Sequence, residues 1–278
     1  MPSQSPLPAG SKLWLLDLGS LDIDASYVLS GANARRGAAA VVHESRPCLM
    51  IAALLYHPTA GLLLFDTGAC EDIIKSWDRE FLECAPRVWV QGTHSLPAAI
   101  RATGAGEITD VQAVVLSHLH LDHAGGLEHF LGTDVEIWCH ETELKNAFWA
   151  AATGLDSGLF RPEYLRADLL NWKTVAEEVV EPWAGVVLHR CPGHTEGLLL
   201  AELTLPVAGT VVLTGDLFHV KENYEEGRPQ GFLMRDYNIW HRSRDYARRL
   251  VHRTNAKVCL GHEKSYFDQF PRSPDFLT

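Results

Sequence analysis

The chain has 278 residues, of which 46% are hydrophobic and 21% charged, and this composition excludes a disordered or collagen-like protein. It is long for one domain, but a single large α/β unit with a sizeable buried core remains compatible with its length. The formal net charge of -11, which no basic block offsets, argues against nucleic acid as a partner.

The cysteines and the N-terminal segment carry information about location. The six cysteines are scattered and form no C-x-x-C pair, which is typical of a reduced, intracellular protein. Residues 1–10 are polar and rich in proline, and they lack the apolar run of a signal peptide. No segment reaches the roughly 18 apolar residues that cross a bilayer. We therefore expect a soluble, cytoplasmic protein that does not enter a membrane.

In the first half of the chain, short hydrophobic runs that end in small polar residues predict strands. The sequence PTAG at 58–61 separates two of these runs and predicts a hairpin. Segments 71–85 and 94–105 are compatible with helices, and the second helix is expected to stop at Gly104. The predicted strands cover residues 13–19, 48–57, 61–68, 111–117 and 135–140.

The pattern changes between residues 141 and 182, where helical stretches rich in aromatic side chains predict an insert. Strands then resume, followed by a helix and a last strand. The two halves that flank the insert have a similar make-up. This order predicts an α/β fold in a single domain over residues 1–278, a four-layer αβ/βα sandwich with a helical insert near 141–182. The later elements are expected at 185–191, 198–205, 210–216, 245–254 and 256–261.

The segment SHLHLDHAGG at 117–126 carries the strongest chemical signal. It places three histidines and an aspartate directly after a hydrophobic strand, where alternating side chains point the same way. Several imidazoles and a carboxylate are poor material for a core unless a divalent cation satisfies them. An H-x-H-x-D-H string therefore predicts a metal site. Its residues are His118, His120, Asp122 and His123.

Three further candidates end later hydrophobic runs, each beside a glycine. They are His194 in CPGHTEG, Asp216 in LTGD and His262 in LGH. Each alone is a weak signal, because a single histidine after a strand is more often structural. Together with the H-x-H-x-D-H string, however, these make four motifs that each follow a predicted strand. In a sandwich of sheets, four such motifs can meet along one edge.

Taken in order, H-x-H-x-D-H, P-G-H-T, T-G-D and G-H, with D-T-G upstream at 66–68, resemble the metallo-β-lactamase superfamily over about residues 50–263. Within it, HLHxDHAGG and DTG are most similar to the N-acyl-homoserine-lactone lactonases and related fungal lactonases and lactamases. The resemblance implies two Zn²⁺ ions, or other divalent metals, with Asp66 supporting the ligands without binding metal. The implied ligands are His118, His120 and His194 for one ion, Asp122, His123 and His262 for the other, and Asp216 as the bridge.

The resemblance implies a hydrolase that opens a small lactone, γ-lactam or cyclic carbamate by attack of a metal-bridging hydroxide. Asp122 and His219 are the candidate catalytic residues. Bacterial homoserine-lactone lactonases carry a tyrosine three residues after the bridging aspartate, and His219 occupies that place here. Its imidazole can donate to the substrate carbonyl or protonate the leaving group, and a structural role stays open. The candidate substrate-binding residues are Phe148, Trp149, Tyr164, Phe218, His219 and Tyr224.

Other functions on the same scaffold stay open at this point. A glyoxalase-II-like thioesterase shares the histidine string, but little sequence follows His262 to form its glutathione-binding domain. A flavodiiron oxidoreductase would carry a glutamate in place of His120, and a single-iron persulfide dioxygenase would use fewer of these ligands. A non-catalytic binding module predicts lost ligands, whereas all seven are present. The expected partner is a small cyclic substrate. The sequence leaves open whether the protein forms a homodimer.

Overall fold

The computed structural model describes residues 5–34, 37, 43–156 and 158–278. Two sheets form the centre of the molecule, one of seven strands in the order β4-β1-β2-β3-β5-β6-β7 and one of five in the order β12-β11-β10-β9-β8. The first sheet contains β1 (Lys12–Asp24), β2 (Ser45–His57), β3 (Gly61–Phe65), β4 (Arg87–Val88), β5 (Val111–Val115), β6 (Glu136–His140) and β7 (Asn171–Val175). The second contains β8 (Val179–Trp183), β9 (Val186–Arg190), β10 (Leu199–Leu205), β11 (Gly209–Leu213) and β12 (Lys257–Cys259).

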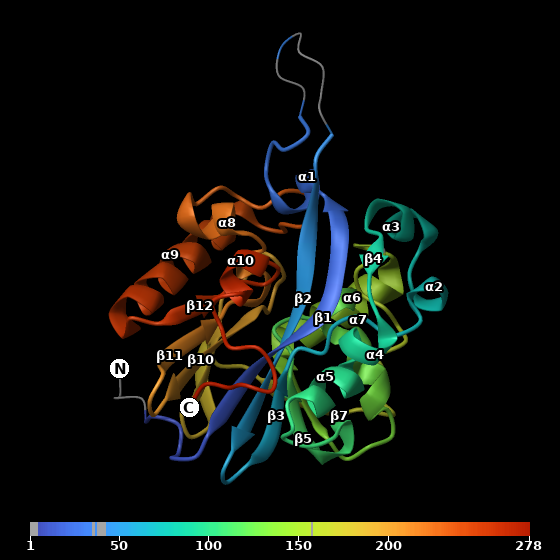
Figure 1. The fold of residues 1–278 in the computed structure, drawn as a ribbon. Coiled ribbons are helices and arrows are strands. Elements are labelled where there is room, and N and C mark those ends of the chain that lie inside the picture. Colours follow the sequence, from blue (N-terminus) through green and yellow to red (C-terminus); the bar gives the residue numbers. More distant parts are fainter. Residues whose placement is uncertain (1–4, 35–36, 38–42, 157) are drawn as a thin grey trace.

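Helices cover the outer faces of both sheets (Figure 1). On the first sheet lie α2 (Ile73–Ser76), α3 (Arg79–Cys84), α4 (Gln91–His94), α5 (Leu96–Ala102), α6 (Leu121–Ala124) and α7 (Glu141–Thr153). On the other side lie α8 (Lys221–Glu225), α9 (Tyr237–Thr254) and α10 (Lys264–Phe267), while α1 (Ala25–Val28) follows β1. Three short 3₁₀ turns complete the described elements: Ile108–Asp110, Gly125–Phe130 and Gly215–Leu217.

Alternation along the central strands produces the layers. In β2, Leu55 belongs to the apolar cluster that joins the two sheets, whereas Leu54 belongs to the cluster under the helices of the first sheet. This is the period of two that a strand buried on both faces requires. A third cluster joins the second sheet to Trp240 and Leu250 of α9. Helices, sheet, sheet and helices are therefore stacked in that order, and the predicted four-layer sandwich is confirmed.

The predicted hairpin at 58–61 is confirmed, because β2 and β3 pair antiparallel with His57 opposite Gly61. The predicted helical insert at 141–182 is wrong beyond Thr153. Instead, β7 pairs in parallel with β6, and β8 pairs with β9, so this stretch supplies an edge strand to each sheet. This stretch forms strands because the edges of the two sheets offer backbone hydrogen-bond partners. Its β-branched residues Val175 and Val179 are also of a kind that strands favour.

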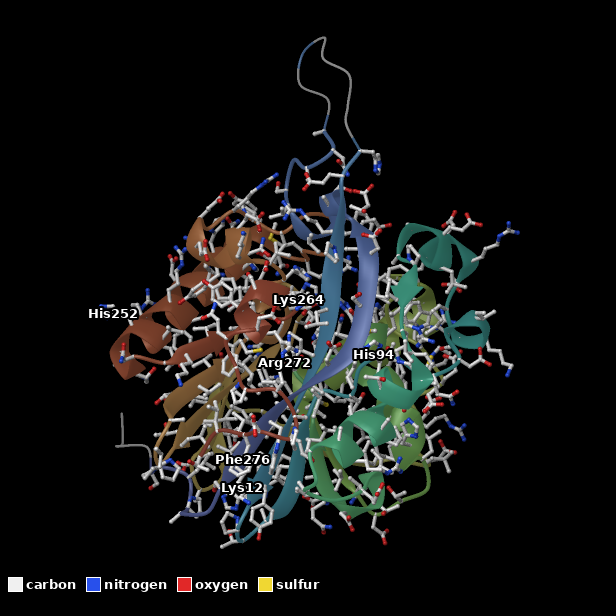
Figure 2. The ribbon with its side chains drawn as sticks, in the orientation of Figure 1. Lys12, His94, His252, Lys264, Arg272 and Phe276 are labelled. Atoms are coloured by element: carbon white, nitrogen blue, oxygen red, sulfur yellow. The ribbon has the colours of Figure 1, made fainter. Side chains whose placement is uncertain are left out.

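The C-terminal segment returns to the start of β1. Leu277 forms a bridge with Leu13, and the Lys12 ammonium lies 4.6 Å from the centre of the Phe276 ring (Figure 2). Trp14 packs against the same ring at 5.2 Å. Within the described part of the chain, none of the helices combines the length and the apolar character needed to cross a membrane.

Candidate metal centre

Loops that leave the ends of β5, β9, β11 and β12 carry the histidines and aspartates singled out in the sequence. The loop after β5 contains the H-x-H-x-D-H string, whose last residues form the short helix α6. The backbone of Leu199, at the start of β10, donates to the Ser117 carbonyl at 2.8 Å and joins the two sheets at this edge. Residues from distant parts of the chain therefore meet in one place.

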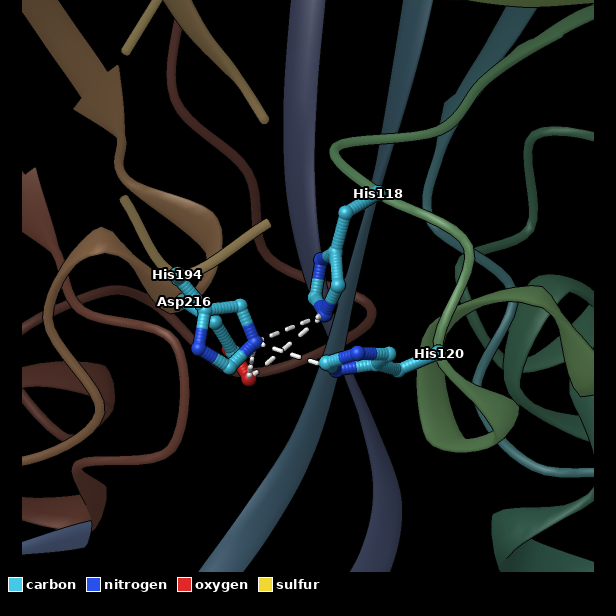
Figure 3. A group of neighbouring side chains, drawn as sticks. All are labelled: His118, His120, His194 and Asp216. Carbon is cyan, nitrogen blue, oxygen red and sulfur yellow. Dashed lines mark hydrogen bonds and ion pairs between the residues drawn. The ribbon is translucent and has the colours of Figure 1, made fainter. Parts of the chain in front are cut away.

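A first group of four buried side chains converges there (Figure 3). Nε2 of His194 lies 3.3 Å from Nε2 of His118 and 3.0 Å from Nδ1 of His120. Oδ2 of Asp216 lies 3.4 Å from Nε2 of His194 and 3.7 Å from that of His118. Each of the four residues is at most 2% exposed. Imidazole nitrogens this close together point at a common centre, as the ligands of a cation do.

A second group lies on the other side of Asp216 and contains Asp122, His123 and His262. The Nε2 atoms of the two histidines are 3.4 Å apart. Oδ2 of Asp122 lies 3.6 Å from Nε2 of His262 and 3.9 Å from Nε2 of His123. Oδ1 of Asp216 completes the group at 3.2 Å from His123 and 3.1 Å from His262. The Asp216 carboxylate thus lies between the two groups.

The donor atoms in these groups fit divalent metal ions. Oδ1 of Asp216 is buried without a hydrogen-bond partner. Unsatisfied buried polar atoms are costly, and a cation coordinated by the carboxylate would remove that cost. Imidazole nitrogen together with carboxylate oxygen is a donor set that suits zinc and similar metals.

Protonation differs between the two groups. Burial lowers the pKa of His118, His120 and His194 well below the ordinary value, so these rings are neutral, which is the form that binds metal. Burial by itself would also lower the pKa of His123. The adjacent carboxylates of Asp216 and Asp122 outweigh this effect and raise the pKa of His123 well above its usual value. Burial opposes ionisation of Asp216, yet the adjacent His123 and His262 hold the pKa of its carboxyl well below its ordinary range.

Hydrogen bonds behind the rings orient them. Nδ1 of His123 donates to Asp66 at 2.9 Å, and Nδ1 of His262 donates to the Leu49 carbonyl at 2.9 Å. The Ser117 hydroxyl donates to Asp66 at 2.7 Å and accepts from Nδ1 of His118 at 3.0 Å. Each of these three rings is thereby held so that its Nε2 faces the centre. Asp66 lies behind the ligands, at a positive φ of 57° in the D-T-G turn.

Gln230 is a contributor that the sequence did not reveal. It is buried, and its side-chain oxygen accepts from Nδ1 of His194 at 3.2 Å. Its amide nitrogen donates to the carbonyls of Asp216 and Leu217, the latter at 3.0 Å. One glutamine therefore fixes both a histidine of the first group and the loop that carries Asp216. A single glutamine in a loop has no pattern that could have identified it.

His219 lies in the centre itself. It is fully buried, its Nε2 is 3.2 Å from Oδ2 of Asp216, and it stacks on His262 with ring centres 5.7 Å apart. Neither of its ring nitrogens has a hydrogen-bond partner. A buried imidazole without partners is costly unless something that binds in the centre satisfies it.

The structure does not bring the other predicted substrate-binding residues to the centre. Phe148 and Trp149 lie on α7 with 38% and 63% of their surface exposed. Phe218 is fully buried against Trp240, and Tyr224 packs between Phe218 and Tyr266. Tyr164 is buried and donates its hydroxyl to the Leu119 carbonyl at 2.7 Å, so it braces the loop of the histidine string from behind.

A cleft of about 490 Å³ lies beside the centre. Leu159 of its wall accepts from the backbone of Leu121 at 2.9 Å, and the neighbouring Phe160 ring lies 4.9 Å from that of His120. Arg235, also in the wall, donates its backbone N–H to Gly193 at 2.9 Å. The cleft therefore borders the loops of both His120 and His194. It is lined by Tyr27, Asp78, Glu80, Phe81, Cys84, Asp156, Leu159, Phe232 and Arg235.

Comparison with known proteins agrees with this site. Residues 46–262 match the family model described as the metallo-beta-lactamase superfamily. The chain is 27% identical over 275 residues to the N-acyl homoserine lactonase AiiB of Agrobacterium fabrum, covering 96% of this chain and 98% of the relative.

Two solved structures share the fold. A mutant of Bacillus thuringiensis AiiA with N-decanoyl-L-homoserine bound at its active site superposes with a TM-score of 0.79 at 23% identity, covering 99% of this chain and 100% of that one. AidC, described as a dizinc quorum-quenching lactonase, superposes with a TM-score of 0.62 at 17% identity, covering 94% and 90%.

Proposed function

Because this chain belongs to the metallo-β-lactamase superfamily and is a metal-dependent hydrolase, we propose that it opens a small cyclic ester or amide with two zinc ions. The substrate class is a lactone, a γ-lactam or a cyclic carbamate. The observation that carries the proposal is the position of the Asp216 carboxylate, which has one oxygen 3.1 Å from His262 and the other 3.4 Å from His194. A carboxylate between two groups of histidines is suited to bridge two cations.

The seven proposed ligands are assigned to the two ions as follows. His118, His120 and His194 would hold one ion, Asp122, His123 and His262 the other, and Asp216 both. When bound, two such ions lower the pKa of a water molecule toward neutrality and polarise the substrate carbonyl.

His219 is the proposed hydrogen-bond donor to the substrate. Its ring nitrogens make no hydrogen bond, and Nε2 lies 3.2 Å from Oδ2 of Asp216. An imidazole N–H can stabilise the oxygen of the carbonyl that is attacked, or pass a proton to the leaving group. Asp122 is the second catalytic candidate, because its carboxylate is the most exposed of the proposed ligands, with 15% of the side chain accessible.

The cleft is the proposed place for the part of the substrate that does not react. Tyr27 and Phe232 form an aromatic wall with ring centres 5.5 Å apart. Arg235 is paired with Asp156, and Asp78 with Arg161, which leaves Glu80 as an additional negative charge among the lining residues. This balance disfavours a carboxylate and favours a neutral, apolar or aromatic substituent. We propose that these lining residues contact the substrate in place of the five that the sequence suggested, Phe148, Trp149, Tyr164, Phe218 and Tyr224.

A metal analysis combined with a substrate panel tests the proposal. We expect protein purified without chelator to contain two zinc ions per chain and to open neutral aromatic lactones, lactams or cyclic carbamates. The panel also contains thioesters, because a glyoxalase-II-like thioesterase is the alternative on this scaffold. One tightly held iron without a second metal, or hydrolysis of thioesters alone, would exclude the proposed function.

A further inference from the structure

We propose that Glu143 is a positioning residue that joins the two loops of the first histidine group and holds them in place before metal binds. The inference rests on the metal centre of the proposed function and assigns a role to a residue outside it. Glu143 lies in the first turn of α7 and is fully buried. Neither its place in the helix nor its sequence neighbours marked it as part of a site.

Each oxygen of Glu143 holds one of the two loops. Oε1 accepts from the backbone N–H of Leu119 at 3.0 Å, and this residue stands between His118 and His120. Oε2 accepts from the backbone N–H of Gly197 at 2.9 Å, in the loop of His194. One carboxylate therefore fixes the backbone that carries all three histidines of the first group.

The carboxylate suits this task better than a neutral side chain. Two buried N–H groups point at it, and a buried donor that loses its acceptor destabilises the structure. Burial raises the pKa of Glu143, while the N–H groups of Leu119 and Gly197 stabilise its ionised form and oppose that shift. The first turn of a helix also favours a negative charge.

The packing at Gly197 shows how closely the loop approaches the helix. A Cβ atom added at this position would lie 2.4 Å from the backbone nitrogen of Glu143. Only glycine allows that approach without displacing the loop or α7. The absence of a side chain at Gly197 therefore allows the close approach that its hydrogen bond to Glu143 requires.

The second group is held by other contacts. His123 is bonded to Asp66 through its ring, and its carbonyl accepts from Thr67 at 2.8 Å. The ring of His262 is bonded to the Leu49 carbonyl. None of these contacts involves Glu143, so its loss should affect the first group selectively.

The test measures metal binding and not turnover. The full-length apoprotein is titrated with Co²⁺ and followed by visible absorption, and the two stepwise constants are assigned with His120→Ala and His123→Ala. Glu143→Gln keeps the volume but places an amide NH₂ against one of the two N–H groups. We expect it to weaken Co²⁺ binding by the first group about 10- to 100-fold, the range typical for partners that orient metal ligands. Binding by the second group should keep the wild-type constant.

Glu202→Gln is the matched control. Glu202 is equally buried, bonded through Oε2 to Nε2 of His189 at 2.9 Å, and contacts no proposed ligand. Its variant should lower the unfolding midpoint in urea and leave both Co²⁺ constants unchanged. If Glu143→Gln behaves like this control, or weakens both groups equally, the positioning role is wrong. A chain that binds two metals but opens no ring would overturn the proposed function and leave this inference standing.

Discussion

The Asp66 carboxylate accepts a 2.9 Å hydrogen bond from Nδ1 of His123, a residue 57 positions further along the chain. It also accepts from the backbone N–H and the hydroxyl of Ser117, both at 2.7 Å. Ser117 in turn accepts from Nδ1 of His118. One carboxylate thereby orients a histidine in each of the two groups, without itself belonging to either group.

We predict from this that Asp66→Asn weakens metal binding about 10- to 100-fold, because it removes the charge that orients His123. Asparagine is chosen because it tolerates the positive φ at this position better than alanine does. Competition with a chromogenic chelator measures the effect. Asp168→Asn, on an exposed side chain paired with Arg166, is the control and should bind metal normally. Normal binding by the Asp66 variant would remove it from the support of the centre.

Asp216→Ala should lose both metals and all measurable turnover, because its carboxylate is shared by the two groups. Asp122→Ala removes a side chain from the second group only, so it should retain one metal per chain. Elemental analysis after gel filtration distinguishes the two results. Retention of two metals by the Asp216 variant would contradict the bridging role.

His219→Ala should lower kcat by about 10²- to 10³-fold, the range typical of one lost donor or acid at a reacting carbonyl. The loss should be larger for lactams than for lactones, because a nitrogen leaving group needs a proton more than an alkoxide does. His219→Tyr should recover part of the rate on lactones, since a phenol donates from the same place. A wild-type rate of the alanine variant on every ring tested would make His219 a structural residue.

Phe232→Ala should raise KM for aromatic substrates about tenfold, because it removes one wall of the cleft. Its folding should be little affected, since the side chain is 70% exposed. Phe148→Ala, another exposed phenylalanine, is the matched control and lies outside the cleft. Equal KM values for the two variants would show that the substrate binds elsewhere.

Tyr164→Phe should lower the free energy of unfolding by about 1–2 kcal/mol and leave the preference among substrates unchanged. The buried hydroxyl donates to Leu119 and to Leu159, the latter at 3.2 Å, and it does not face the cleft as a lining residue. Urea denaturation measures the first effect and the ratio of kcat/KM values the second. A changed ratio of kcat/KM values would return Tyr164 to the substrate-binding residues.

The metal-centre candidates could be read from the sequence because their chemistry is local. The string of His118, His120, Asp122 and His123 combines residue types that a core does not accept without a cation. His194, Asp216 and His262 follow hydrophobic runs that predicted strands, and the structure places all seven side chains in adjoining groups. The strands themselves were recognised by their apolar runs, which are needed to bury both faces of a sheet.

Tertiary contacts alone decided the rest. Residues 171–175 and 179–183 became strands because two sheet edges offered backbone partners, and that outweighed the local helical pattern. Gln230 and Glu143 acquired their roles because buried N–H and imidazole groups far along the chain needed acceptors. The cleft arose where segments around Tyr27, Phe81 and Phe232 come together. A side chain's partners in the core depend on which segments the packed sheets bring beside it, and no local pattern records that.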